Sequence, residues 1–177
     1  MSSKISIQYF KTPLGELILG SFEDKLCLCD WRYRKMRSEI DSRIQKSLQA
    51  HYVEEDTPIL QKTRLQIEEY LKGDRKEFDI PFIMLGSDFQ KEVWNELLTI
   101  SYGEKETYLG LSKKINKESA LRAIAAANGA NAISIIIPCH RIIGSNQKLV
   151  GYAGGIQVKR KLLELESKGQ ADPWQLF

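Results

Sequence analysis

The chain has 177 residues, 42% hydrophobic and 28% charged, a composition typical of a soluble globular protein with one domain or two small ones. No apolar run approaches the ~20 residues that span a bilayer, and the start of the chain lacks the apolar core of a secretory signal, so we expect no membrane partner. Three cysteines are too few for a disulfide framework, which favours a reduced, cytoplasmic setting, or a nuclear one in a eukaryote.

The net charge of +3 is unevenly distributed. Residues 1–80 hold 14 basic and 14 acidic side chains, whereas residues 107–161 hold nine basic side chains and a single acidic one, Glu118. This concentration favours a polyanionic partner, although a solvated basic face would have the same composition.

The N-terminal part alternates apolar and polar side chains over residues 5–31, with turn signals near Pro13 and Asp24. This pattern predicts a small antiparallel sheet of about three strands. Cys27 and Cys29 are two residues apart and are therefore expected on one face of a strand. Because too few histidines accompany them, we interpret both as strand residues and expect no metal site.

Residues 31–57 are polar and lack a clean apolar stripe, which predicts a loop and a helix with a mobile part. A second helix is predicted over residues 58–73, with Pro58 in its first turn and Gly73 as its stop. The composition changes near residues 80–86, where we expect a domain boundary, placed between residues 82 and 83.

A third helix follows this boundary. Ser87 and Gln90 form a capping box. The apolar stripe behind it comprises Phe89, Val93, Trp94, Leu97 and Leu98.

Two short helices, over residues 108–115 and 119–128, are predicted next, an arrangement that suggests a helix-turn-helix, although many helical hairpins bind nothing. The spacing of the second separates a face with Leu121, Ile124, Ala125 and Asn128 from one with Arg122, Ala123 and Ala126. An arginine among alanines is well placed to enter a groove of DNA, and packing against a neighbouring helix is the alternative for the alanines.

The apolar run over residues 132–137 predicts a buried strand ended by Pro138, followed by a glycine-rich loop and a final helix that Gly169 stops. On that helix Glu166 falls on the inward stripe of Val158, Leu162 and Leu165. A buried carboxylate is costly without a partner, so Glu166 should be paired, unless the last turn frays into solvent.

Cys139 lies directly after Pro138 and is followed by His140 and Arg141. A thiolate needs a basic or hydrogen-bonding neighbourhood, which His140 could provide through a water molecule, while its other ring nitrogen binds Glu166. This would be a sulfur, imidazole and carboxylate relay of the kind found in nucleophilic enzymes. The alternative is a buried, inert cysteine whose histidine neighbour caps a backbone carbonyl.

The stretch RAIAAANGANAISIIIPCHRIIGSNQKLVGYAGG closely resembles the signature of the O6-alkylguanine-DNA alkyltransferase family, and FQKEVWNELLTISYGE resembles the segment before its helix-turn-helix. The match is strong over residues 78–168. The stretches TPLGELILGSFEDKLCL and QIEEYLKGDRKEFDIPF resemble the N-terminal domain. The resemblance implies an α/β fold: a small ribonuclease H-like α/β domain (1–82) and a mainly α domain with the helix-turn-helix (83–177).

The family's activity is suicide repair of duplex DNA that contains alkylated bases. The damaged guanine is turned out of the stack, and its O6 alkyl group moves irreversibly to a protein cysteine without any cofactor. O4-alkylthymine is a further candidate substrate, and we expect a monomer.

The resemblance also implies a role for each site residue. Cys139 would be the acceptor, and His140 and Glu166 would help to form its thiolate. Tyr108 would assist the leaving base, and Asn131 would hold the active-site turn. The DNA-binding residues would be Arg122, Ala123, Ala126 and Arg141, and Tyr152, Ala153 and Gly154 would line the base pocket.

Several positions depart from the family pattern. Ser101 replaces a frequent proline, Ala130 and Ala132 stand where arginine or another polar residue and proline are common, and Leu109 to Leu111 stand where smaller residues are frequent. Two other classes stay open: a lesion recogniser of the same fold that transfers nothing, and a cysteine hydrolase using Cys139 and His140.

Overall fold

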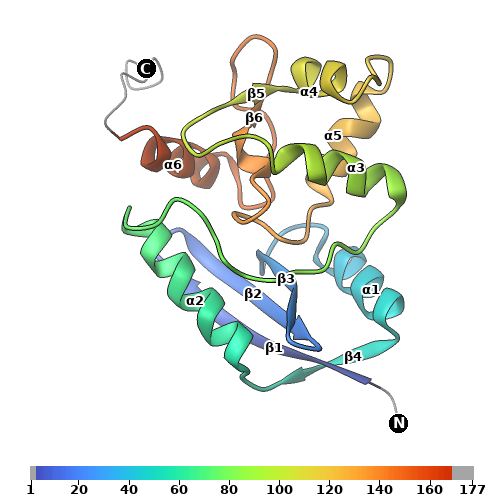
Figure 1. The fold of residues 1–177 in the computed structure, drawn as a ribbon, viewed down its shortest axis with the longest axis vertical. Helices are drawn as coiled ribbons and strands as arrows, with labels where there is room; N and C mark the ends of the chain where they lie inside the picture. The colour runs from blue at the N-terminus through green and yellow to red at the C-terminus, as the bar shows by residue number, and fades with distance from the viewer. Residues whose placement is uncertain (1–2, 169–177) are drawn as a thin grey trace.

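The computed structural model describes residues 3–168 and opens with a four-stranded sheet (Figure 1). The strands are β1 (Ser3–Thr12), β2 (Gly15–Phe22), β3 (Lys25–Trp31) and β4 (Ala50–Glu54), in the order β3-β2-β1-β4. The first three form the predicted antiparallel meander, and β4 runs parallel to β1 at the edge. Glu23 and Asp24 both have positive φ, as the tight turn between β2 and β3 requires.

Two helices accompany the sheet, α1 (Arg37–Leu48) and α2 (Pro58–Leu71), with α2 packed against β1, β2 and β3. The predicted second helix is confirmed, with Pro58 at its start and Gly73 in the left-handed conformation just beyond its end. In residues 31–57 the predicted helix is present as α1, but strand β4 was not predicted.

The second half is mainly helical. Its elements are α3 (Asp88–Leu97), β5 (Glu106–Thr107), α4 (Tyr108–Lys114), α5 (Leu121–Gly129), a 3-10 turn (Cys139–Arg141), β6 (Ile142–Ile143) and α6 (Ile156–Glu166). The capping box of α3 is confirmed, since Ser87 and Gln90 each accept the other's backbone N–H. Helix α5 packs against both α3 and α4, as the predicted pair of short helices requires. The predicted stop at Gly169 lies outside the described residues.

The predicted strand over residues 132–137 is wrong. This segment is fully buried, but it is folded into tight turns, with Ile135 at φ 72° and a hydrogen bond from Ile137 N–H to the Ile133 carbonyl. Only Ile133 forms an isolated bridge, to Cys29 at the edge of β3. An apolar run that is surrounded on all sides has the same composition whether its backbone is extended or turned, so the pattern could not distinguish the two.

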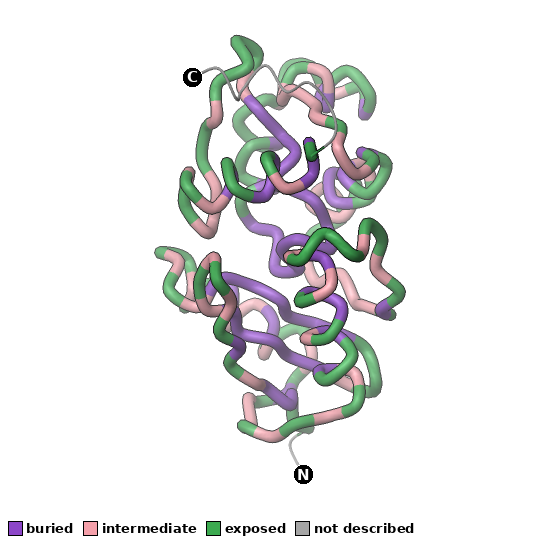
Figure 2. Tube along the Cα trace, turned by 90° about the vertical axis from the view of Figure 1, so that its left-hand side faces the viewer, coloured by how far each residue is buried: buried purple, intermediate pink, exposed green. Residues whose placement is uncertain are grey.

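One hydrophobic core runs through both halves of the molecule. The larger buried cluster joins strand residues such as Leu19 to Trp94 of α3, Ile137 and Leu162 of α6, and the buried trace passes through the sheet and on into the helices (Figure 2). The expected boundary falls where residues 81–83 run along β3 and bond to Leu26, and it stays a prediction. No helix among residues 3–168 is long and apolar enough to cross a membrane.

Cys27 and Cys29 do not share a face as expected. The β2–β3 register skips Cys27, which forms a bulge opposite Gly20 and Ser21. Cys29 consequently packs in the larger core cluster and Cys27 in a smaller one with Ile40 and Ile44 of α1. The described residues contain no group of side chains that could hold a metal ion, and both cysteines are ordinary core residues.

Candidate active site

Cys139 begins the 3-10 turn that follows Pro138, and its residue surface is only 4% exposed. Two asparagines hold this turn. The Asn131 side chain accepts the Ile133 N–H at 2.9 Å and donates to the Ile137 carbonyl at 2.9 Å, just before the cysteine. Asn128 of α5 donates to the Cys139 carbonyl at 3.5 Å and to the Tyr108 hydroxyl at 3.4 Å. The turn is therefore fixed by one side chain from the last turn of α5 and by another from just beyond that helix.

The surroundings of the Cys139 thiol act on its pKa in opposite directions. Burial raises the pKa of the Cys139 thiol, while the hydrogen bond of Asn131 and the charge of Lys159 lower it. The ammonium of Lys159 is fully buried and donates to the carbonyls of Ile142, Val150 and Gly151. Burial lowers the pKa of Lys159 to about 8, so near neutral pH most of the Lys159 side chains still carry the charge that favours the thiolate.

Lys159 is one of the nine basic side chains of residues 107–161, yet it is buried and does not belong to the basic surface that their number predicts. A signal was present, because Lys159 precedes Leu162 by three residues and Leu163 by four, which places it on the inward stripe of α6.

Glu166 receives four hydrogen bonds. His140 Nε2 lies 2.8 Å from Oε1, Arg141 donates to both carboxylate oxygens at 2.8 and 2.9 Å, and the Tyr70 hydroxyl donates at 2.7 Å. The predicted pairing of Glu166 with His140 is confirmed, and the alternative of a solvated, frayed turn is wrong, since Glu166 is 3% exposed.

Arg141 does not lie on the surface, where a DNA contact would place it. Arg141 is 7% exposed. Its guanidinium donates hydrogen bonds to the Glu166 carboxylate and, at 2.5 Å, to the Ile100 carbonyl. A buried guanidinium paired with a carboxylate is held by that pair. The predicted DNA contact is therefore corrected to a structural ion pair.

The protonation states of this cluster follow from its contacts. Although burial opposes ionisation, His140 and Arg141 hold the pKa of Glu166 well below its usual range. Burial lowers the pKa of His140 and so favours a neutral ring, although the charge of Glu166 acts in the opposite direction. If Nε2 carries the proton toward Glu166, Nδ1 is an acceptor, and among the described residues it has no hydrogen-bond partner.

A cavity of about 850 Å³ opens over Cys139. It is lined by Tyr108, Asn128 and Asn131, by the glycine-rich loop over residues 150–155, and by residues 33–36 of the N-terminal half. The predicted pocket residues Tyr152, Ala153 and Gly154 all line it, whereas residues 33–36 were not predicted.

Trp31 of β3 supports the loop on the N-terminal side. Its Nε1 donates to the Tyr152 hydroxyl at 3.1 Å. A Cβ at Gly154 would lie 2.8 Å from the indole ring, so this contact requires glycine.

Helix α5 presents its arginine outward. Arg122, Ala123 and Ala126 are exposed as predicted, and Ile124, Ala127 and Asn128 face α3 and α4. Leu121 and Ala125, predicted on the same side of the helix as Ile124 and Asn128, are exposed, because the helix buries only a narrow stripe. Ala125, one helical turn after Arg122, lines the cavity, so the exposed side of α5 that carries Arg122 extends to the mouth of the cavity.

Comparison with known proteins assigns both halves to one family. Residues 5–83 match the ribonuclease-like domain of 6-O-methylguanine DNA methyltransferase, and residues 88–168 match its DNA binding domain. A curated methylated-DNA--protein-cysteine methyltransferase from Methanosarcina acetivorans is 39% identical over 158 residues, which cover 89% of this chain and 95% of that protein. The chain belongs to the 6-O-methylguanine DNA methyltransferase family.

Solved structures of this methyltransferase family have the same fold. A Mycobacterium tuberculosis OGT in complex with DNA is 35% identical, with a TM-score of 0.78 over 94% of this chain and 96% of that one. The O6-methylguanine methyltransferase of the same organism is 34% identical, with a TM-score of 0.76 over 98% and 99%.

Proposed function

We propose that this chain repairs duplex DNA by moving a methyl or other alkyl group from O6 of guanine to the sulfur of Cys139. The observation that carries this proposal is a buried thiol at a cavity, next to a histidine that is paired with a glutamate. The same cavity is lined in part by helix α5, whose exposed face carries Arg122. The family assignment supports it, as do relatives named methylated-DNA--protein-cysteine methyltransferase and a related structure in complex with DNA.

The first step is formation of the thiolate. His140 Nδ1 accepts the Cys139 proton through a water molecule, and the imidazolium that forms is stabilised by Glu166, 2.8 Å from Nε2. Arg141 keeps Glu166 ionised during this transfer. The sulfur then attacks the alkyl carbon in line, a carbon–sulfur bond forms, and the bond from that carbon to O6 breaks. Tyr108, at the cavity wall, donates a proton to the leaving guanine and then regains one from the His140 imidazolium through solvent, so that in sum the thiol proton ends on the guanine.

Access to the alkyl carbon requires the base to leave the duplex, because Cys139 is buried at a cavity that only an extruded base can enter. Helix α5 would enter the minor groove, where Ala123 and Ala126 allow close approach and Arg122 fills the space of the extruded base. The loop with Tyr152, Ala153 and Gly154 would hold the base over Cys139. A mispaired, alkylated guanine is cheaper to unstack than an intact pair, which favours damaged sites.

The reaction ends in a thioether, which has no easy route back to a thiol. One chain therefore repairs one lesion. We also propose that repair takes place in the cytoplasm, because the chromosome of a bacterium or an archaeon, the sources of the relatives above, lies there.

The stoichiometry of repair tests this proposal. Duplex DNA with a single O6-methylguanine, in excess over protein, should lose methyl groups until one lesion per chain is repaired and then no more. The Cys139→Ser variant should repair none, and Cys29→Ser, which changes a core cysteine, should reach the same plateau as the wild type. Continued turnover beyond one lesion per chain would favour a hydrolase, and no repair at all would favour a lesion recogniser.

A further inference from the structure

The C-terminal end of helix α5 is held by side chains from the N-terminal half of the molecule. A helix leaves its last carbonyls without partners, and α5 has no basic residue in its last turn to meet them. Arg34 donates to the carbonyls of Gly129 and Asn131, and Arg43 of α1 donates to Ala130 at 2.8 Å. Three consecutive carbonyls at the helix end thus accept bonds from two guanidinium groups, which also complement the negative end of the helix dipole.

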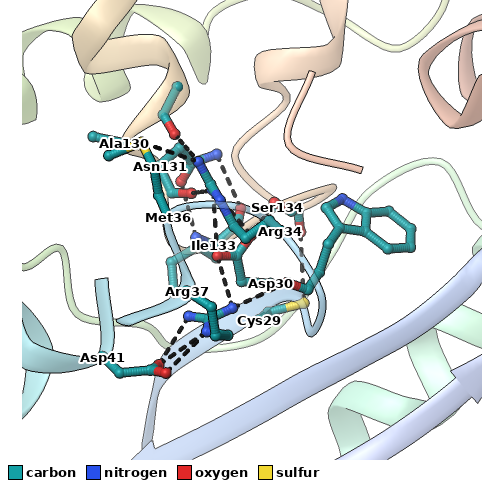
Figure 3. Close-up of polar contacts among 12 residues, drawn as sticks. Cys29, Asp30, Arg34, Met36, Arg37, Asp41, Ala130, Asn131, Ile133 and Ser134 are labelled. Atoms are coloured by element: carbon teal, nitrogen blue, oxygen red, sulfur yellow. Dashed lines mark hydrogen bonds and ion pairs between the residues drawn. The ribbon is translucent and has the colours of Figure 1, made fainter. Parts of the chain in front are cut away.

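Asp30 at the end of β3 orients Arg34. Its carboxylate is completely buried and lies 3.3 Å from Arg34 and 3.0 Å from Arg37, while the Ser134 hydroxyl donates to it at 3.1 Å (Figure 3). The Arg34 side chain is 5% exposed and extends from this carboxylate toward the backbone at Asn131. Only a planar fork of donors meets one carboxylate and two carbonyls together, so an arginine is specifically suited to this place.

The backbone that Arg34 holds carries the groups that fix Cys139. Asn128 immediately precedes Gly129 and bonds both the Tyr108 hydroxyl and the Cys139 carbonyl. Asn131 bonds the Ile137 carbonyl before the cysteine. Arg34 also lines the cavity over the thiol. A shift of the helix end would therefore move the DNA-facing helix and the thiol's supports together.

We propose that Arg34, oriented by Asp30, is a positioning residue for alkyl transfer. Arg34 holds the end of α5 and the backbone at Asn131 against the N-terminal sheet. In this way the sheet acts as a rigid support that fixes the position of Cys139 relative to Arg122 of α5. The inference rests on the proposed function and adds to it a role for the N-terminal half. Because misplacement of about 1 Å can cost a large factor in rate, loss of this frame should be visible in the chemistry itself.

The test compares two substrates at saturation in single-turnover experiments: duplex DNA with O6-methylguanine, and the free base O6-benzylguanine. Arg34→Ala should react about tenfold more slowly with both substrates, because the carbonyls of Gly129 and Asn131, on which the positions of α5 and of the thiol both depend, lose their charge-assisted hydrogen bonds. Arg34→Lys should recover only part of the rate, since an ammonium cannot span both carbonyls. Asp30→Asn should slow both reactions in the same direction.

Arg32→Ala is the matched control. Arg32 lies in the same segment but pairs with Glu16 and stacks on Tyr9, away from α5, so its rates should equal the wild type. Wild-type saturating rates for Arg34→Ala, with only a lower melting temperature, would overturn the inference, because that is the result of a purely structural role. Should Arg34→Ala fail to fold, wild-type rates for Arg34→Lys would overturn it equally. A wild-type protein that transfers nothing would instead refute the proposed function.

Discussion

At the residue scale, one carboxylate organises the base of the site. Glu166 binds His140, Arg141 and Tyr70, which come from the 3-10 turn and from α2. The inward position of Glu166 on α6 could be predicted from periodicity, and so could the need for a partner. The sequence could not predict that Arg141 and Tyr70 supply most of the hydrogen bonds to Glu166. Tyr70 is distant in sequence, and local spacing does not say which polar neighbour turns inward.

Glu166→Gln should lower the free energy of unfolding by about 3–5 kcal/mol, because Arg141 then remains a buried cation without its counter-charge. Tyr70→Phe removes one hydrogen bond and keeps the ion pair, so it should cost only about 1 kcal/mol. Urea unfolding of both variants at neutral pH measures the difference. Equal losses for the two would contradict a dominant ion pair.

The stability that Glu166 contributes should also depend on pH. Its folded pKa lies below the unfolded value, so its contribution is complete above an unfolded pKa of about 4.3 and is lost as the pH falls from there toward the folded pKa. The difference in unfolding free energy between wild type and Glu166→Gln should therefore be constant near neutrality and shrink below about pH 4. A difference that grew on acidification would have the wrong sign for this assignment.

At the element scale, α6 holds the glycine-rich loop through Lys159. Lys159→Met removes the donor that binds three carbonyls of this region, so the loop should loosen and the reaction with the free base should slow by about tenfold. Lys161→Met, an exposed lysine on the same helix, is the control and should leave that rate unchanged. The measurement is the single-turnover rate at saturating free base.

Helix α5 acts on a different step. Arg122→Ala should weaken repair of duplex DNA with much less effect on the free base, because the free base does not have to be extruded. The readout is the ratio of the two single-turnover rates for the variant and the wild type. Equal losses on both substrates would exclude Arg122 from the extrusion step.

Sequence patterns located these elements better than they described the connections between them. The capping box placed α3, and Pro58 and Gly73 placed α2, because caps and stops are local signals. Strand β4 was not predicted, since an edge strand with one half-buried face shows no strong alternation. The apolar composition of residues 132–137 indicates that the segment is buried but does not distinguish an extended backbone from a turned one.

At the scale of the whole molecule, the two halves share one core and should unfold together. Backbone bonds join Cys29 to Ala132 and Ser134, and Tyr70 reaches Glu166 across the halves. Variants in which Trp31 or Trp94 is replaced by Phe should each give one midpoint by tryptophan fluorescence and far-UV circular dichroism, since a shared core unfolds cooperatively. Two separated midpoints in either variant would show that the halves are independent.

The most direct test of the account is the mass of the peptide that contains Cys139. After incubation with duplex DNA carrying O6-methylguanine and proteolytic digestion, this peptide should gain the mass of one methyl group, with fragmentation placing it on the sulfur of Cys139. The peptides with Cys27 and Cys29 should be unchanged, because both thiols are buried in the core and neither lines the cavity that opens over Cys139. An unmodified Cys139 peptide beside repaired DNA, or a methyl group on another residue, would contradict the account.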